Sequence, residues 1–365
     1  MGSRLFVYVT SHGFGHLNRT VAVLNRISAE IPITIKCDPG LFNHWGERLR
    51  RPADFQAYVS DAGAFNPPGD SSKTDGPGTI ARAMAIHEDA LVLLDEEVAR
   101  LQEANAGAVL VDAPPLPLVA AKRAGVPGYL LGNFTWAEIY EPHARKIGPD
   151  AVAFVNELKR CYRQATGVFR TEPALKMAGI APTEDVGMVV TPGRDRRAEL
   201  RQMFAIPESQ KVVYFYVGRY GQANLGWERL AKVSNVHFVG FHPAPNGPMI
   251  NFHVVPPHDW TGADLAASAD AMVAKAGYGT ACEAMVAGTP FVYPPRTGFR
   301  EHRALDLALR VWGGGVPAST REFAELRLEN LLTKAFHLKP GPPPFGKDGA
   351  EIIAERLTSI CRKAH

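Results

Sequence analysis

The stretch Leu5-Phe6-Val7-Tyr8-Val9-Thr10-Ser11-His12-Gly13-Phe14-Gly15-His16 joins an apolar run to a glycine-rich turn. The second half of the chain repeats this arrangement: Ala271-Met272-Val273-Ala274 is followed by Lys275-Ala276-Gly277-Tyr278-Gly279-Thr280. Each stretch predicts a buried parallel strand, a glycine turn and a helix. Such a turn exposes backbone N–H groups beside a helix N-terminus, which suits an anion. The chain is therefore expected to form two sheets, each with its own glycine turn.

The length and composition of the chain indicate a globular protein with two domains. Its 365 residues exceed the size at which one hydrophobic core usually stops growing. Hydrophobic residues make up 46% of the sequence and charged residues 21%, an ordinary globular balance. The net charge of +3 gives no reason to expect a nucleic-acid partner.

The cysteines and the apolar runs bear on where the protein resides. Cys37, Cys161, Cys282 and Cys361 are far apart and form no CxxC pair, which is typical of reduced thiols and predicts no metal site. No apolar run approaches the roughly 18 residues that cross a bilayer. A strand begins so early that no room is left for a signal peptide. We expect a cytoplasmic protein without a transmembrane segment, and peripheral membrane contact stays open.

The first half of the chain alternates segments typical of strands and of helices. Strands are expected at 4–10, 33–37, 55–61, 108–113, 129–134, 167–171 and 186–190. Helices are expected at 16–29, 79–104, 116–124 and 151–165. Because strands that alternate with helices form parallel sheets, this half predicts a doubly wound, Rossmann-like α/β domain over 1–188.

A second alternation begins after Pro192-Gly193 and predicts a second Rossmann-like domain over 189–345. Its strands are expected at 212–218, 236–240, 251–255, 271–275 and 290–293. Its helices are expected at 224–232, 280–287, 301–311 and 321–336. A proline-rich spacer at 340–344 precedes an amphipathic helix within 346–365, which we expect to cross back to the first domain.

The first glycine turn places two histidines near a strand end. His16 would stand at the start of a helix, whose dipole disfavours a protonated imidazole, so His16 can accept a proton. Asp112 ends a second apolar strand, where a carboxylate can orient a histidine. We expect His16 and Asp112 to be a catalytic base pair. His12 stays an alternative base, and a purely capping role stays the alternative for all three residues.

The second glycine turn predicts a phosphate site. Gly277 and Gly279 let the backbone approach a ligand, and Thr280 can cap the helix while its hydroxyl faces a phosphate. Glu283, one turn into that helix, can accept hydrogen bonds from a ribose, and Lys275 can neutralise a diphosphate. The other residues expected to bind the same ligand are Gly15, Gly218, Arg219, Tyr278, Glu301 and His302.

A second substrate is expected on the first domain. Residues 62–78 contain four glycines and three prolines without apolar periodicity, which predicts a loop. In a βα fold this loop would lie near the carboxyl ends of the strands, where ligands bind. Aromatic side chains there can stack on a sugar or on another flat molecule. The residues expected to line this pocket are His12, Phe14, Phe65, Asn133, Phe134, Trp136 and Tyr140.

The two turns together resemble the GT-B glycosyltransferases. The segment 11–19 is similar to their N-terminal glycine-histidine motif, and 275–290, with Glu283, is similar to their donor signature. The resemblance implies two Rossmann-like domains facing across a cleft. We expect an inverting transfer of a hexosyl or pentosyl group to an acceptor hydroxyl, and no metal is expected because Lys275 and Arg219 supply positive charge. The donor would be a nucleotide sugar, with UDP as the first choice, and no further cofactor is expected.

Within that fold the chain most resembles the glycosyltransferase-like N-terminal domain of arabinokinases. The shared residues are His-Gly-Phe-Gly-His at 12–16, Asn-Phe-Thr-Trp at 133–136, and 275–280. The peptidoglycan N-acetylglucosaminyltransferase and UDP-glycosyltransferase families are more distant likenesses. Lys275 stands where many of these enzymes have a histidine, and Glu301-His302 replaces their acidic residue and glutamine. The nucleotide base and the sugar of the donor, and the identity of the acceptor, therefore stay open.

Other functions fit parts of the sequence. Gly13-x-Gly15 after a strand, with Asp38 closing the next strand, is typical of a nicotinamide dinucleotide site. However, Asn18 replaces the third glycine of that pattern, and the second glycine turn stays unexplained. A sugar-nucleotide epimerase of the same fold and a non-catalytic nucleotide-sugar-binding protein are the remaining alternatives.

Overall fold

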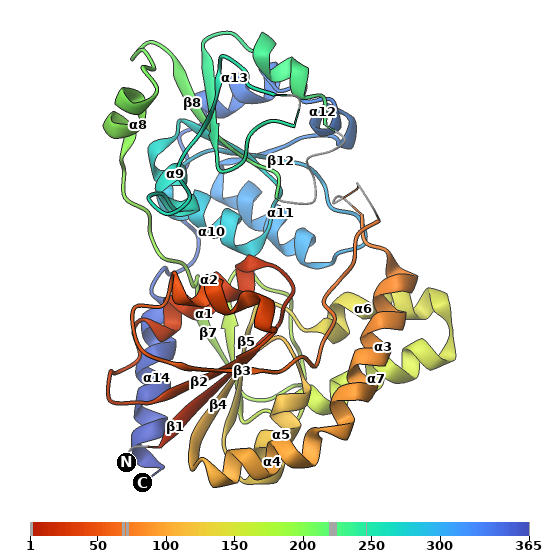
Figure 1. The fold of residues 1–365 in the computed structure, drawn as a ribbon. Coiled ribbons are helices and arrows are strands. Elements are labelled where there is room, and N and C mark those ends of the chain that lie inside the picture. Colours follow the sequence, from red (N-terminus) through yellow and green to blue (C-terminus); the bar gives the residue numbers. More distant parts are fainter. Residues whose placement is uncertain (1–2, 68–69, 71–72, 219–224, 246, 365) are drawn as a thin grey trace. The chain divides into compact units, whose positions relative to one another are not determined.

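The computed structural model describes residues 3–67, 70, 73–218, 225–245 and 247–364. The chain divides into two compact units (Figure 1). The N-terminal unit comprises residues 1–65, 75–190 and 345–365, and the C-terminal unit comprises 66–74 and 191–344. Residues 66–74 thus group with the C-terminal unit, although the sequence placed the whole loop at 62–78 in the first domain.

The N-terminal unit is built on a seven-stranded parallel sheet in the order β3-β2-β1-β4-β5-β6-β7. The order reverses between β1 and β4, so the sheet is doubly wound and has its switch point there. The strands are β1 (Arg4–Val9), β2 (Ile33–Cys37), β3 (Asp54–Ala57), β4 (Ala106–Asp112), β5 (Gly128–Gly132), β6 (Gly167–Thr171) and β7 (Thr183–Gly187).

Helices on both faces cover this sheet. They are α1 (Phe14–Leu24), η1 (Pro39–Leu41), α2 (Phe42–Gly46), α3 (Gly76–Val92), α4 (Leu94–Glu103), α5 (Leu116–Ala124), α6 (Trp136–Ile147), α7 (Pro149–Tyr162) and α14 (Gly349–Lys363). The last helix, α14, packs Ile353 and Leu357 into the core formed by α1, β1 and β2. Burial of such side chains stabilises a fold by about 1.5–3 kcal/mol each. Ser3 Oγ also donates to the Cys361 carbonyl, which holds the two ends of the chain together (Figure 1).

The C-terminal unit contains a six-stranded parallel sheet in the order β10-β9-β8-β11-β12-β13. Its switch point lies between β8 and β11. The strands are β8 (Lys211–Tyr216), β9 (Val236–Gly240), β10 (Phe252–Val254), β11 (Ala271–Ala274), β12 (Phe291–Tyr293) and β13 (Gly315–Pro317). The helices are α8 (Arg197–Met203), η2 (Trp227–Lys232), α9 (Gly262–Ser268), α10 (Tyr278–Ala287), α11 (Glu301–Trp312), α12 (Thr320–Ala324) and α13 (Glu329–His337).

Several element boundaries differ from the sequence-based expectation. The helix expected at 79–104 is two helices, because the backbone tightens at Leu93, whose N–H bonds to the Ala90 carbonyl at 3.2 Å. The helix expected at 321–336 is also divided, because buried Leu326 adopts a φ of 47° that ends α12. Helix α6 was not predicted, although Thr135 and Glu138 form a capping box at its start. Strand β13 and helix α9 were likewise missed.

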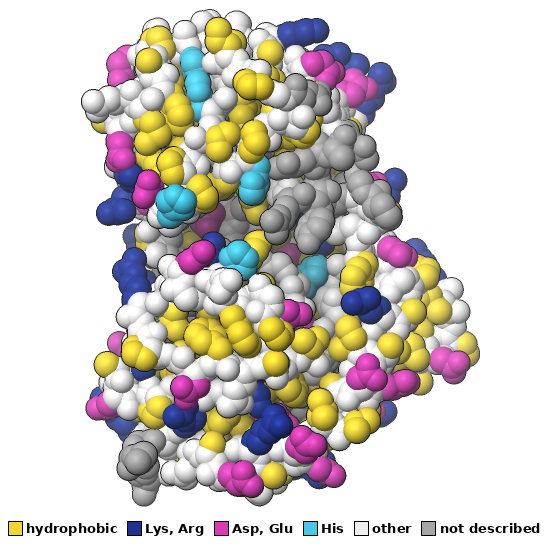
Figure 2. All heavy atoms as spheres, in the orientation of Figure 1, with side chains coloured by type: hydrophobic (Ala, Val, Ile, Leu, Met, Phe, Trp, Pro, Cys, Tyr) yellow, Lys and Arg dark blue, Asp and Glu magenta, His cyan; other side chains and the backbone are white. Residues whose placement is uncertain are grey.

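The surface and the helices can be compared with the expectation of a globular protein without a transmembrane segment. On the face drawn in Figure 2, Lys and Arg side chains are interspersed with Asp and Glu side chains. No helix within the described part of the chain is long and apolar enough to cross a bilayer.

The two sheets described above form two doubly wound, Rossmann-like α/β domains, which confirms the predicted fold class.

Candidate functional site

One candidate site lies at the switch point of the N-terminal sheet. Val9 at the end of β1 pairs in register with Asp112 at the end of β4. The chain then turns through Gly13, whose φ of 79° suits glycine, and enters α1. His16 is the third residue of α1, and its Nδ1 lies 2.7 Å from Asp112 Oδ1. The structure thus brings together the two residues that the sequence singled out.

Asp112 is fully buried and binds two further side chains that the sequence analysis missed. Arg19 donates from Nε to Oδ2 at 2.7 Å and from Nη2 to Oδ1 at 2.5 Å. Thr20 Oγ1 donates to Oδ2 at 2.8 Å. Burial alone would raise the pKa of Asp112, but the charge of Arg19, together with His16 and these hydrogen bonds, lowers it well below its usual range. Asp112 is therefore ionised.

His16 is a candidate proton acceptor, with a side chain that is 9% exposed. If its Nδ1 donates to Asp112, its Nε2 carries the lone pair that accepts a proton. Arg19 Nη2 also lies 2.9 Å from His16 Nδ1, because both nitrogens contact the same carboxylate oxygen. Arg19 and Thr20 lie three and four residues beyond His16 on α1, and that spacing is the sequence signal that could have found them.

His12 has a different environment from His16. Its Nδ1 accepts a hydrogen bond from the backbone N–H of Ala64 at 3.2 Å. This contact favours the tautomer in which Nε2 carries the proton, and that tautomer donates at Nε2. The His12 ring also meets Trp136 edge to face, with centroids 5.2 Å apart. These contacts favour His16 over His12 as the base.

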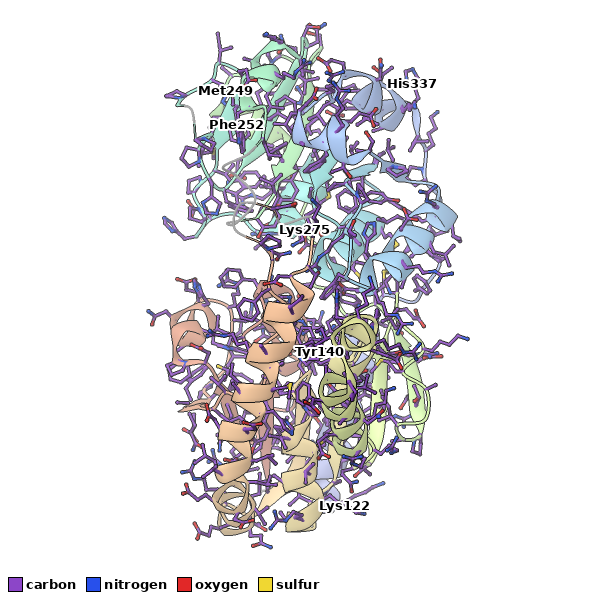
Figure 3. The ribbon with its side chains drawn as sticks, turned by 90° about the vertical axis from the view of Figure 1, so that its right-hand side faces the viewer. Lys122, Tyr140, Met249, Phe252, Lys275 and His337 are labelled. Carbon is purple, nitrogen blue, oxygen red and sulfur yellow. The ribbon has the colours of Figure 1, made fainter. Side chains whose placement is uncertain are left out.

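The residues expected to line an acceptor pocket fall into two groups. Phe134, Trp136 and Tyr140 are buried, and Trp136 stacks on Tyr140 with centroids 5.5 Å apart. Phe134 meets the His16 ring edge to face at 5.7 Å. These aromatic side chains form a packed wall beside His16, in the helical region where Figure 3 labels Tyr140. Asn133, also buried, accepts from Arg19 Nη1 at 2.7 Å and so supports the Asp112 network.

The second group is more exposed than the first. Phe14 and Phe65 are both 36% exposed. Phe14 meets His44 edge to face at 4.8 Å, and the guanidinium of Arg82 lies 5.2 Å from the Phe65 ring centroid. Gly15, expected near the donor, is exposed in the first turn of α1. Exposed aromatic faces here are available to a ligand.

Asp61 is a further carboxylate near His16 that sequence reasoning missed. It accepts from Trp136 Nε1 at 2.5 Å. Burial raises its pKa to about 6, although hydrogen bonds from Thr10 and Trp136 and the nearby His16 oppose the shift. Asp61 follows β3 by a few residues, and the sequence analysis had assigned this stretch to the strand itself.

A separate candidate site, in the C-terminal unit, is the glycine turn at the switch point of its sheet. Lys275 N–H bonds to the Tyr216 carbonyl at 3.3 Å, which ties the turn to β8. Helix α10 begins at Tyr278, so its first N–H groups lie beside Gly277 and Gly279. Thr280 Oγ1 accepts from Gly277 N–H at 3.1 Å and lies close to the Lys275 and Gly277 carbonyls. Its hydroxyl therefore folds back on the turn, whereas we expected it to face a phosphate.

Two basic side chains lie at this turn. Figure 3 marks Lys275, which follows β11, and burial lowers its pKa to about 7, with Arg296 adding to the shift and Glu301 opposing it. Burial likewise lowers the pKa of Arg296 to about 10. Arg296 lies over the Phe299 ring at 3.6 Å. Arg296 was missed because it stands in an irregular segment after β12. This cationic turn is suited to a diphosphate.

The structure also describes Glu283, Glu301, His302 and Gly218, which we expected to bind the donor. Glu283 lies on α10, and burial raises its pKa to about 7, with the charge of Asp264 adding to the shift. Glu301, the first residue of α11, is buried, and burial lowers the pKa of its neighbour His302. Gly218 adopts a φ of 77° after β8. Arg219 lies outside the described residues.

Two doubly wound parallel sheets, each with a glycine turn at its switch point, define a GT-B glycosyltransferase-like fold. The glycosyltransferase of kitacinnamycin shares it, with a TM-score of 0.64 and 16% identity over 100% of this chain and 96% of that chain. UGT2 of Phytolacca americana, solved with UDP-2fluoro-glucose and pterostilbene, gives a TM-score of 0.65 and 13% identity over 100% of this chain and 94% of that chain. At these identities the likeness is one of fold.

One curated protein gives a sequence match that agrees with the resemblance found in the motifs. L-arabinokinase of Arabidopsis thaliana is 28% identical over 368 residues, which covers 98% of this chain. The chain spans 34% of the length of that relative. No protein-family profile matches the chain.

Proposed function

We propose that this chain is a glycosyltransferase that moves a sugar from a nucleoside diphosphate sugar to an acceptor hydroxyl. The observation that carries the proposal is the buried His16–Asp112 pair, a proton acceptor at the switch point of one sheet. The C-terminal sheet carries a glycine turn with the basic side chains Lys275 and Arg296. The named glycosyltransferases of the same fold support this class of reaction.

The donor is proposed to bind the C-terminal unit. Its diphosphate accepts hydrogen bonds from the N–H groups at the start of α10, including that of Gly279, while Lys275 and Arg296 neutralise its charge. Glu283 accepts hydrogen bonds from the ribose. Hydrogen bonds to charged groups contribute about 1.5–3 kcal/mol each. Since two side-chain cations are present, the proposal needs no metal for the diphosphate, and UDP is the first choice of nucleotide.

The acceptor is proposed to bind the N-terminal unit, against the aromatic wall of Phe134 and Trp136. His16 Nε2 removes the proton from the acceptor hydroxyl, and Asp112 stabilises the imidazolium that forms. The acceptor oxygen attacks the anomeric carbon while the bond from that carbon to the diphosphate oxygen breaks on the opposite face. The transfer therefore inverts the anomeric configuration, and the glycine turn stabilises the charge on the leaving diphosphate.

The setting of the reaction is proposed to be the cytoplasm. All four cysteines are buried thiols that form no disulfide, which fits a reducing compartment. The partners are then a nucleotide-sugar donor and a small-molecule or glycan acceptor.

The decisive experiment is a binding panel followed by a turnover assay. Calorimetry with nucleoside diphosphates and then with nucleotide sugars identifies the donor, and NADH serves as the control for a dinucleotide site. Incubation of the donor with candidate acceptors should give a glycoside of inverted configuration. A new sugar-nucleotide epimer formed without acceptor would instead indicate an epimerase. If no nucleotide binds, the donor assignment fails.

A further inference from the structure

A cluster of three metal-ligating side chains lies on helices that the proposed reaction does not use. His87 is on α3, and Glu157 and Cys161 are on α7. Their candidate ligand atoms all lie within 4.8 Å of one another. Glu157 and Cys161 are four residues apart, so they share one face of α7. Cys161 Sγ lies 3.7 Å from Glu157 Oε1.

His87 gives an independent reason to expect a ligand at this cluster. His87 is 4% exposed, and neither of its ring nitrogens has a hydrogen-bond partner within the described part of the chain. A buried polar group left without a partner is destabilising, because its lost contacts with water are not replaced. Buried imidazoles are therefore rarely left in this state. A metal ion bound to one of the nitrogens would satisfy it.

We propose that His87, Glu157 and Cys161 bind a zinc ion, with water as the fourth ligand. Imidazole, carboxylate and thiolate are the protein ligands of zinc, and bonds of about 2.0–2.3 Å place ligand atoms about 3.3–3.8 Å apart in a tetrahedral site. The separation of Sγ and Oε1 already fits, and the remaining ligand atoms need to move inward by about an ångström at most. On binding, the Cys161 thiol loses its proton to solvent and a Zn–S bond forms.

The surroundings of Glu157 suit an entry point for the ion. Its side chain is 39% exposed, whereas His87 and Cys161 are buried. Arg160 Nε donates to Glu157 Oε2 at 3.0 Å, which leaves Oε1 facing Cys161.

The ion would act by bracing the aromatic wall. His87 meets Phe154 edge to face at 5.5 Å, and Phe154 stacks with Tyr140 at 6.5 Å. Tyr140 in turn stacks on Trp136, which lies 6.2 Å from the His16 ring. Zinc would join α3 to α7 at the far end of this row of rings. The site takes no part in the proposed transfer, so it stands independently of the proposed function.

The test uses the full chain, freed of metal with a chelator and titrated with cobalt(II) chloride and zinc chloride. Cobalt should give a thiolate charge-transfer band that zinc abolishes, and zinc should raise the melting temperature. The band and the stabilisation should disappear in Cys161→Ser and persist in Cys282→Ser, a buried cysteine of the other unit. No cobalt–thiolate band in the parent, or a band that survives in Cys161→Ser, overturns the proposal.

A second variant covers the case in which Cys161→Ser does not fold. Glu157→Gln changes a partly exposed side chain, so it should keep the parent's circular dichroism spectrum. Loss of one ligand should weaken zinc affinity at least about tenfold. Unchanged zinc affinity in folded Glu157→Gln would also contradict the proposal.

Discussion

Arg19 binds both carboxylate oxygens of Asp112, with Nε 2.7 Å from Oδ2 and Nη2 2.5 Å from Oδ1. His16 Nδ1 contacts the same Oδ1 at 2.7 Å. The carboxylate that would stabilise an imidazolium at His16 is thus shared with a permanent cation. Asp112 therefore has a structural task, the pairing of a buried guanidinium, in addition to the proposed catalytic one.

We predict that Asp112→Asn is strongly destabilising. The amide leaves Arg19 buried without its carboxylate, a change that typically costs about 3–5 kcal/mol of unfolding free energy. The matched control is Asp185→Asn, which breaks a bidentate pair with Arg170 at a side chain that is 54% exposed and should cost at most about 1 kcal/mol. Urea denaturation of both variants measures the difference, and equal losses would refute the buried-pair argument.

The same pair predicts a pH dependence of stability. The pKa of Asp112 is lower in the folded state than in the unfolded state. Its contribution to the free energy of unfolding is therefore complete above the unfolded pKa of about 3.9 and is lost as the pH falls through the folded pKa. The parent should therefore lose stability more steeply below about pH 4 than Asp112→Asn does. Parallel acid-denaturation curves would contradict the depressed pKa.

We predict that His16→Ala lowers turnover by about 10²–10⁴-fold, the usual contribution of a general base. Donor affinity should stay nearly unchanged, since the donor is assigned to the other unit. His12→Ala should cost less turnover, because His12 Nδ1 already accepts from Ala64 N–H. Single-turnover kinetics of both variants checks this order. A larger loss in His12→Ala would transfer the role of base to His12.

Lys275 should take up a proton when a diphosphate binds. Burial and Arg296 lower its pKa to about 7, so the amine is mostly neutral at pH 8 in the free protein. A bound anion favours the charged form, so binding at pH 8 draws a proton from solvent. Calorimetry of UDP binding in two buffers with different ionisation enthalpies measures this uptake. The uptake should vanish in Lys275→Met; if it persists there, another group is responsible.

Glu283→Gln should stabilise the protein above neutral pH while weakening donor binding. Burial raises the pKa of Glu283 to about 7, so the folded state holds a proton that the unfolded chain releases near its ordinary pKa. The contribution of Glu283 to the free energy of unfolding therefore falls as the pH rises from about 4.5 through 7. At pH 8 the variant should gain on the order of 1–3 kcal/mol in unfolding free energy.

The nucleotide affinity of Glu283→Gln can be measured separately from its free energy of unfolding. Loss of a charge-assisted hydrogen bond to the ribose should weaken nucleotide affinity by about 10-fold or more. Because the variant is expected to be more stable, weaker binding would not reflect misfolding. Unchanged nucleotide affinity would remove Glu283 from the donor site.

Local features could be predicted from the sequence because they depend on neighbouring residues. The apolar runs, the glycine turns and the helix beginning beside His16 follow from side-chain periodicity and from backbone freedom at Gly13. The strand ends also located His16 and Asp112 at one edge of a parallel sheet. The breaks at Leu93 and Leu326 carry no glycine or proline, so nothing in the local sequence marked them.

The chemical state of the site depended on residues far apart in the chain. Arg19 and Asp112 are 93 positions apart in the chain, and only the pairing of β1 with β4 brings them together. Likewise, Arg296 shifts the pKa of Lys275 only because the segment after β12 returns beside the turn after β11. The sequence by itself determined which elements form and which residues end them. The tertiary structure decided which charges share a buried environment, because desolvation and Coulomb interactions depend on distance in space and not on separation along the chain.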